Sequence, residues 1–270
     1  MKITAILSAL LLAGVLATAG PAKAAPNEIQ MIKQRGTLVV GVKADYPPFG
    51  FRAPNGEIEG LEPDLAADVA KRLGVKVEFV PVTGSNRMQF LNQGKIDLLI
   101  ATMGDTPERA KIVDIIHPDY YASGYSVLAS DELHLTDWNQ LKGKPVCGIQ
   151  GAYYNKSASQ KFGVNVVAFT GVVEALTALK QGRCVAFLYD NTEIEAQLQS
   201  GQWPGYGMPL PVLDAVPWAV AIKPGEPDFA KFMSGVIADW HRTGFIIQLE
   251  TKWKLPHSEY VAEMHKKYAS

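Results

Sequence analysis

Short apolar runs alternate with amphipathic stretches through most of the chain. Each apolar run is four to eight residues long, which is typical of strands that are buried in a core. The runs predict strands at residues 37–43, 75–82, 96–101, 125–129, 146–149, 164–169 and 185–189.

The amphipathic stretches carry helix signals at their ends. Pro63 suits the first turn of a helix whose apolar positions recur at helical spacing, and Gly74 suits its end. Thr106 and Pro107 are typical of the N-cap and first position of another helix. Further helices are predicted at residues 87–92, 156–162, 172–181, 229–240 and 245–253.

This alternation predicts an α/β fold, and a weak internal repeat favours two similar lobes. Residues 90–96 resemble residues 178–184, because in both a helix ends at Gln-Gly, is followed by a cation and enters an apolar strand. Chance similarity is the alternative, since glycine and a cation are common at helix ends. Ligands of open α/β sheets bind beyond the carboxyl ends of the strands. We therefore expect a cleft formed by residues 43–51, 102–109, 150–154 and 190–192.

Composition narrows the class of protein. The chain has 270 residues, 26 basic and 27 acidic side chains, and a mean hydropathy of +0.02. These values argue against disorder, a collagen-like repeat and a basic nucleic-acid-binding surface. We expect no nucleic-acid partner.

Residues 1–24 are typical of a cleaved signal peptide. Lys2 precedes an uncharged apolar run that ends at Ala22-Lys23-Ala24, a small-x-small cleavage site. A membrane anchor is the alternative. No cysteine follows the cut, and no later segment approaches the roughly 20 apolar residues of a membrane span. We expect a soluble periplasmic protein.

The expected cleft brings together groups that suit an amino-acid zwitterion. Arg109, in the first turn of a helix, offers a planar fork for a carboxylate. Thr102 can donate a hydroxyl, and Gly104 exposes a backbone N–H. Asp190 supplies a negative group for an ammonium, and Tyr46 an aromatic wall. The alternative is that Arg109 and Asp190 are ordinary surface charges.

Several motifs, in order, resemble a known family. The chain is similar to the bacterial periplasmic amino-acid-binding proteins of ABC importers, solute-binding protein family 3, over essentially all of its predicted mature length. The motifs include Thr37-Leu38-Val39-Val40-Gly41-Val42, Asp45-Tyr46-Pro47-Pro48-Phe49-Gly50-Phe51, Gly60-Leu61-Glu62-Pro63-Asp64-Leu65, Gly94-Lys95-Ile96-Asp97, Thr106-Pro107-Glu108-Arg109-Ala110 and Leu141-Lys142-Gly143-Lys144.

The resemblance implies a type II periplasmic binding protein fold. Each lobe would be a mainly parallel sheet flanked by helices, and two strands would form the hinge. Residues 25–125 with 222–270 would form the first lobe and residues 126–221 the second. The implied partner is an ABC permease, and we expect a monomer without a cofactor.

The resemblance also implies roles for single residues. Arg109 matches the arginine that grips the α-carboxylate, assisted by Thr102 and the backbone of Gly104. Asp190 matches the carboxylate that holds the α-ammonium, and Tyr46 the aromatic that packs on the ligand.

Phe51, in the expected cleft segment at residues 43–51, is a further candidate for a ligand contact. Ala152 and Tyr153 replace the two threonines of a common Gly-Thr-Thr, so they are expected to offer backbone contacts at most. Gly104 is a second departure, because relatives often have Ser or Thr there.

Two cations are expected to read the ligand's side chain. Lys43 stands where basic-amino-acid and glutamine binders commonly have Asp, and Arg87 lies in a stretch similar to that of glutamate/aspartate binders. Both favour an acidic ligand and would repel Arg or Lys. Alternatively, Lys43 and Arg87 pair with Asp45 or Glu62, and the ligand is a polar neutral amino acid.

Cys147 and Cys184 fall near two predicted strands of the second lobe. A disulfide is favoured in an oxidising compartment, and some relatives look similar at both positions. Two buried free thiols are the alternative.

The sequence has no HExxH, GxSxG or P-loop motif, so a binding protein without catalysis is the leading hypothesis. A cyclohexadienyl (prephenate or arogenate) dehydratase-like enzyme on the same fold is the alternative, and a sensory binding protein is a third.

Overall fold

The computed structural model describes residues 27–269, so the predicted signal peptide lies outside the described residues. The strands are β1 (Thr37–Val42), β2 (Asp45–Tyr46), β3 (Gly50–Arg52), β4 (Ile58–Glu59), β5 (Lys76–Pro81), β6 (Leu98–Leu99), β7 (Asp114–Ser130), β8 (Pro145–Ile149), β9 (Asn165–Phe169), β10 (Ala186–Asp190), β11 (Tyr206–Gly207) and β12 (Leu213–Ile222).

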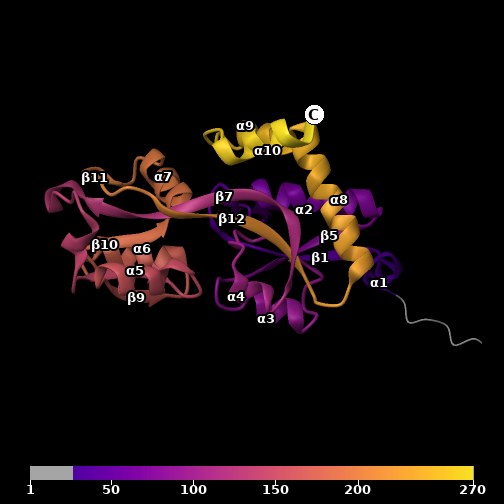
Figure 1. Ribbon diagram of the computed structural model, residues 1–270, viewed down its shortest axis with the longest axis horizontal. Coiled ribbons are helices and arrows are strands. Elements are labelled where there is room, and N and C mark those ends of the chain that lie inside the picture. Colours follow the sequence, from indigo (N-terminus) through magenta and orange to yellow (C-terminus); the bar gives the residue numbers. More distant parts are fainter. Residues whose placement is uncertain (1–26, 270) are drawn as a thin grey trace, which may run out of the picture.

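The helices connect and cover these strands (Figure 1). They are α1 (Glu28–Arg35), α2 (Leu61–Leu73), α3 (Arg87–Asn92), α4 (Pro107–Ala110), α5 (Tyr154–Phe162), α6 (Val172–Lys180), α7 (Asn191–Gln199), α8 (Pro227–Thr243), α9 (Phe245–Lys252) and α10 (Glu259–Ala269), with 3₁₀ turns η1 (Asp131–Leu133) and η2 (Trp138–Leu141).

The main sheet has two parallel ends joined by two long antiparallel strands. Its order is β5-β1-β6-β12-β7-β10-β8-β9, with β11 on β7 and a separate small sheet β2-β3-β4. Strands β5, β1 and β6 are parallel at one end, and β10, β8 and β9 at the other. Figure 1 shows β7 and β12 running from one group of helices to the other. The predicted two-lobed α/β fold with a two-stranded hinge is therefore confirmed.

We call the part around β1, β5 and β6 the first lobe, and the part around β8, β9 and β10 the second lobe. The predicted lobe limits, at residues 125 and 222, fall inside β7 and at the end of β12. Because both strands serve both lobes, the position of each limit along them stays a prediction.

Local signals placed several helices correctly. Helix α2 has Pro63 in its first turn and ends at Gly74, whose φ of 73° gives the left-handed C-cap that glycine favours. The side chain of Thr106 accepts a hydrogen bond from Arg109 N at the start of α4. Helix α8 ends at its C-cap Gly244, which lies in the gap between the predicted helices at residues 229–240 and 245–253. The sequence prediction did not specify α1, α7, α10 or β12, and it located only the last third of β7.

The internal repeat is confirmed as a repeat of local structure. Lys95 N bonds Phe90 O after α3, and Arg183 N bonds Ala178 O after α6, both at 3.0 Å. Gly94 has a φ of 67°, and Gly182, its counterpart after α6, has a φ of 69°. Each turn leads into a strand that carries site residues at its carboxyl end.

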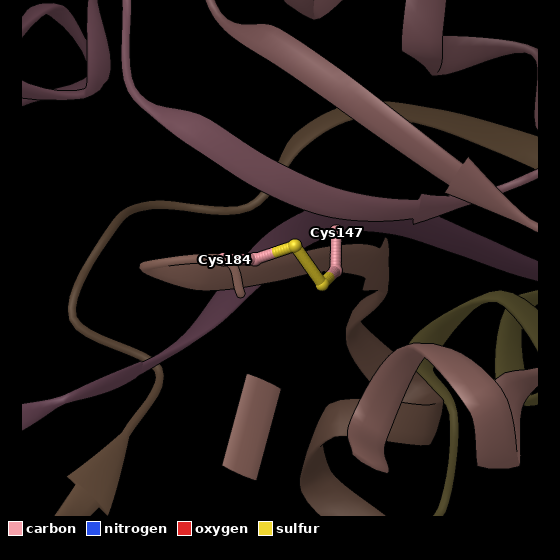
Figure 2. The surroundings of a disulfide bond; sticks show 2 residues. All are labelled: Cys147 and Cys184. Carbon is pink, nitrogen blue, oxygen red and sulfur yellow. A yellow bond between two sulfur atoms is a disulfide. The ribbon is translucent and has the colours of Figure 1, made fainter. Parts of the chain in front are cut away.

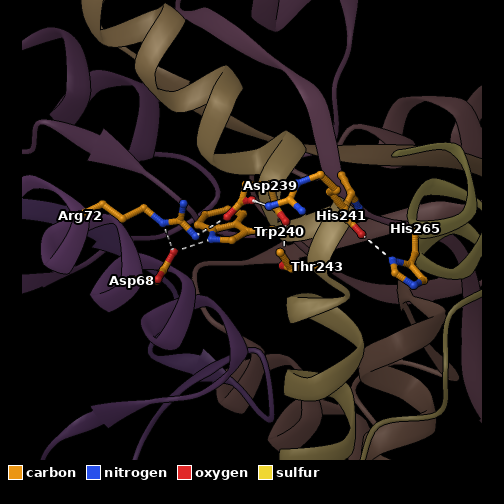
Figure 3. Close-up of polar contacts among 8 residues, drawn as sticks. Asp68, Arg72, Asp239, Trp240, His241, Thr243 and His265 are labelled. Atoms are coloured by element: carbon orange, nitrogen blue, oxygen red, sulfur yellow. Dashed lines mark hydrogen bonds and ion pairs between the residues drawn. The ribbon is translucent and has the colours of Figure 1, made fainter. Parts of the chain in front are cut away.

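The C-terminal helices are fixed to the first lobe by polar contacts (Figure 3). Asp68 on α2 accepts hydrogen bonds from Arg72 Nε at 2.6 Å and from the indole N–H of Trp240 on α8 at 2.7 Å. His265 Nδ1 on α10 donates to His241 O on α8 at 2.6 Å. These contacts make α2, α8 and α10 one unit behind the first lobe. Among the described residues, no helix is long and apolar enough to cross a membrane.

A disulfide joins Cys147 on β8 to Cys184, which lies just before β10 (Figure 2). The two Cα atoms are 5.5 Å apart, and both residues are buried. The favoured prediction of a disulfide is therefore confirmed. The bond closes a loop with a sequence separation of 37 that contains α5, β9 and α6.

Replacing both cysteines, Cys147→Ala with Cys184→Ala, is expected to lower the free energy of unfolding by about 2–4 kcal/mol, because the unfolded chain gains the freedom of that loop. Thermal unfolding should then shift down by roughly 5–15 °C. Reducing agent serves as the control, since it should lower the melting temperature of the native protein and leave that of the double variant unchanged. Equal melting temperatures for the two proteins without reductant would contradict a stabilising role.

Candidate ligand-binding site

A small cavity lies between the two lobes. Eight of the ten predicted ligand-site residues line it: Lys43, Arg87, Thr102, Gly104, Arg109, Ala152, Tyr153 and Asp190. The other lining residues are Gly84, Ile149, Gln150, Gly151, Tyr154, Tyr189 and Trp218. As the sequence indicated, the lining residues come mainly from loops that follow strands.

Arg109 is held at the cavity by backbone oxygens from both lobes. Its Nη1 donates to Gly104 O at 2.7 Å in the first lobe, and its Nη2 donates to Gly151 O at 2.9 Å in the second. Burial, together with the charge of Arg87, lowers the pKa of this guanidinium to about 9, while the charge of Asp190 opposes the shift. Arg109 is still a cation at neutral pH, and its fork has five N–H donors, so donors are left for a carboxylate.

Asp190 stands at the carboxyl end of β10 and accepts two weak hydrogen bonds. Ser123 Oγ donates to Oδ1 at 3.2 Å and Tyr46 OH donates to Oδ2 at 3.3 Å. Trp218 Nε1 in turn donates to Ser123 Oγ at 2.9 Å, which fixes that hydroxyl. Burial raises the pKa of Asp190 to about 6, so the group is mostly a carboxylate at neutral pH. A buried carboxylate with long hydrogen bonds can accept a shorter, charge-assisted one from an ammonium.

Thr102 is in the left-handed region, with a φ of 46°. This conformation costs on the order of 1–3 kcal/mol for a residue other than glycine. Its N–H donates to Glu62 Oε1 at 2.6 Å, which holds the backbone in place. The bend directs the chain from β6 toward Gly104, where a Cβ would lie only 3.2 Å from Arg109 Nη1.

Lys43 and Arg87 both line the cavity, but each has partners within the protein. Lys43 Nζ lies 2.7 Å from Asp45 Oδ1, although not in the direction of a hydrogen bond. Arg87 Nη1 donates to Ala101 O, and its Nε has no hydrogen-bond partner among the described residues. Burial lowers the pKa of Arg87. The alternative that Lys43 pairs with Asp45 is therefore the arrangement in this structure.

Glu62 is a buried acid next to these cations. It accepts hydrogen bonds from Thr102 N and Tyr120 OH through Oε1, while Oε2 has no partner in the described part of the chain. Burial raises the pKa of Glu62 to about 7, although the charges of Arg87 and Lys43 oppose the shift. The sequence indicated Glu62 only as a partner for a cation, because nothing local shows that a glutamate on an amphipathic helix faces inward.

Tyr46 and Phe51 lie outside the cavity lining. Tyr46 is fully buried behind the cavity, where its hydroxyl lies 2.7 Å from Thr192 Oγ1 and bonds Asp190. Phe51 packs edge-on against Trp253, with ring centroids 5.8 Å apart. The predicted ligand contacts of both residues stay predictions, and in this structure the Tyr46 hydroxyl donates to Asp190.

Aromatic side chains form much of the cavity wall. Tyr154, Tyr189 and Trp218 all line it. The Tyr153 ring also contributes, with its centroid 5.9 Å from Arg109 Cζ, so this residue offers more than its backbone. Each of these rings reaches the cavity through packing between segments that are distant in sequence, which no local pattern reveals.

The lobes are closed on each other in this structure. Asp45 Oδ2 in the first lobe accepts a hydrogen bond from Val172 N at the start of α6, at 3.1 Å. Tyr46 bonds Thr192 across the same cleft, and Arg109 reaches Gly151 O. These contacts hold the two lobes together beside the cavity.

Residues 38–256 match the family described as bacterial extracellular solute-binding proteins, family 3. The ABC transporter glutamine-binding protein GlnH of Bacillus subtilis is 30% identical over 233 residues, which cover 84% of each chain. A solute receptor for L-cysteine of Neisseria gonorrhoeae superposes with a TM-score of 0.79 at 31% identity, over 83% of this chain and 92% of that one. An ancestral amino-acid-binding protein, described as a precursor of cyclohexadienyl dehydratase, superposes with a TM-score of 0.76 at 30% identity, over 83% of this chain and 98% of that one. This chain, with two lobes and a cavity between them, belongs to family 3 of the bacterial extracellular solute-binding proteins.

Proposed function

We propose that this protein captures an L-amino acid outside the cytoplasmic membrane and delivers it to an ABC permease. Arg109 binds the α-carboxylate and Asp190 binds the α-ammonium as the lobes close. The observation that carries the proposal is that these two opposite charges, 7% and 6% exposed, line one cavity from opposite lobes.

Charge burial explains why a zwitterion fits. A guanidinium or a carboxylate that is removed from water needs a partner of opposite charge. In the closed protein, Arg109 has only neutral carbonyl oxygens as hydrogen-bond partners and Asp190 only hydroxyl groups. An amino acid supplies a carboxylate to the first and an ammonium to the second. The bound ligand therefore joins the lobes by two charge-assisted contacts.

An acidic side chain is the finer proposal. Arg87 and Lys43 line the same cavity, and Arg87 Nε faces no hydrogen-bond acceptor among the described residues. Because Asp45 lies 2.7 Å from Lys43, the second cation is already partly neutralised, and Arg87 carries most of the preference. A polar neutral ligand is the second candidate, since the named binding proteins of glutamine and L-cysteine are similar to this chain.

We propose binding without catalysis. A dehydratase needs an acid that transfers a proton to the substrate. Glu62, whose pKa is about 7, is not among the residues that line the cavity. Asp190 does line it, but its hydrogen bonds from Ser123 and Tyr46 hold it as an ammonium acceptor. The similarity to a precursor of cyclohexadienyl dehydratase keeps prephenate turnover as an outcome to be measured.

A thermal-shift screen of the ligand-stripped protein against the twenty L-amino acids and prephenate tests the proposal. A ligand at about 100 times its dissociation constant stabilises the fold by roughly 2.7 kcal/mol, or about 5–10 °C for a chain of this size. We expect the largest shifts with glutamate and aspartate. Shifts with neutral amino acids alone would contradict the proposed preference for acidic ligands. Prephenate turnover without a shift for any amino acid would contradict the proposed amino-acid binding.

Arg109→Ala is expected to weaken binding of every amino acid by about 2–5 kcal/mol, because it leaves the ligand carboxylate buried without its partner. This corresponds to a loss of roughly 30-fold or more, measured by titration calorimetry. Arg52→Ala is the matched control, since Arg52 is exposed and its side chain donates to the nearby Gly56 O, away from the cavity lining. A loss of less than tenfold in Arg109→Ala would contradict its assigned role.

Arg87→Met should separate acidic from neutral ligands, because it keeps an unbranched, though shorter, side chain and removes the cation. Affinity for glutamate should fall at least tenfold more than affinity for glutamine, since only the former loses a charge-assisted contact. Competition titrations with the two ligands measure the difference. An equal loss for both would mean that Arg87 supports the fold of the cleft and does not read the side chain.

A further inference from the structure

The two lobes touch backbone to backbone at one point on the rim of the cavity. Gly84, in the loop before α3, lies against Gln150 and Gly151, which follow β8 in the second lobe. A Cβ built on Gly84 would lie 2.6 Å from Gln150 O. A Cβ built on Gly151 would lie 2.4 Å from Gly84 O and 2.9 Å from Ser85 N.

Conformation alone does not require glycine at both positions. Gly151 has a φ of 82°, which most other residues adopt only with strain. Gly84 is outside the left-handed region, so any L-residue can adopt its backbone geometry. What excludes a side chain at Gly84 is a carbonyl oxygen of the opposite lobe, and that oxygen is near only when the lobes are closed.

This contact is part of the ligand cavity. Gly84, Gln150 and Gly151 all line it. Gly151 O also accepts the hydrogen bond from Arg109 Nη2 at 2.9 Å. Gly151 therefore takes part both in the backbone contact with Gly84 and in the hydrogen bond from Arg109.

We infer that Gly84 is a positioning residue for lobe closure. Its missing side chain lets the second lobe approach until Arg109 reaches Gly151 O and the cavity is sealed. The inference deepens the proposed function and rests on it, because closure matters to binding only if the cavity holds the ligand.

The expected cost of one methyl group follows from the distances. A Cβ atom essentially never lies within 3.0 Å of such a neighbour. Relieving this contact takes a separation of the two backbones on the order of 0.5–1 Å, which is enough to lose a quarter to a half of the energy of a dispersion contact. The bond from Arg109 to Gly151 O would lengthen by a similar amount, toward the limit of a hydrogen bond. A ligand that enters the open cleft normally would then leave a cleft that cannot close fully.

The test compares Gly84→Ala with Gly235→Ala, using L-glutamate and L-glutamine as probes. Gly235 lies on the exposed face of α8, and a Cβ built on it would have no heavy atom within 4 Å outside its own helix and chain neighbours, so its variant controls for the loss of a glycine. Stopped-flow binding gives the association and dissociation rates, and small-angle X-ray scattering gives the contraction on ligand addition.

We expect Gly84→Ala to melt within about 2 °C of the native protein without ligand, since the clash needs closed lobes. Its dissociation rate should rise at least tenfold with an association rate within about threefold, and its contraction should be smaller. Gly235→Ala should match the native protein in all of these.

Native dissociation rates and contraction in Gly84→Ala would overturn the inference, and so would a large loss of stability without ligand, which would make Gly84 a residue of the fold. If the native protein itself bound no amino acid and did not contract, the proposed function would fail first and the inference with it.

Discussion

The cost of burying Arg109 and Asp190 is the constraint on which the rest of the molecule depends. Neither group has an ionic hydrogen-bond partner among the described residues, yet each is almost fully removed from water. A protein tolerates this only where the fold holds the groups firmly and a ligand supplies the missing charges. The strained Thr102, the bond from Ser123 to Asp190 and the N-cap Thr106 all hold one of these two charges in place.

The hinge strands β7 and β12 connect the two lobes that carry Arg109 and Asp190. Strands β7 and β12 belong to both lobes (Figure 1), so the lobe closure proposed above would turn about these two strands. Trp218 on β12 packs between Phe49 and Tyr121, with ring centroids 5.0 and 5.3 Å away, and also lines the cavity. A large ring at the pivot moves little during rotation, so it forms a constant floor while the charged groups approach from either side.

The sequence predicted what is local and missed what depends on packing. Helix α2 followed from Pro63 and Gly74, and Arg109 followed from its place in the first turn of a helix, because these signals act within a few residues. The pairing of Lys43 with Asp45 stayed open, since a charged pair in a loop is decided by what lies opposite.

The aromatic wall was predicted only in part, for the same reason: Tyr154 fell within the expected cleft segment 150–154 but was given no role there. Tyr154 and Tyr189 look like ordinary core residues in the sequence, and only the contact between lobes exposes them to the cavity. Phe51 lies in one motif with Tyr46, yet its ring packs against Trp253, which follows α9. Family resemblance supplied the topology, which apolar periodicity left undetermined between several α/β arrangements.

Asp45 gives the closed state a bias that is independent of any ligand. Helix α6 begins at Gly171, which has no side chain to cap its free N–H groups, and the carboxylate of Asp45 takes that place from the other lobe. A helix cap of this kind contributes about 1 kcal/mol, and here it exists only while the lobes are together. Under the proposed function, the ligand would therefore act on lobes that this cap already favours in the closed arrangement.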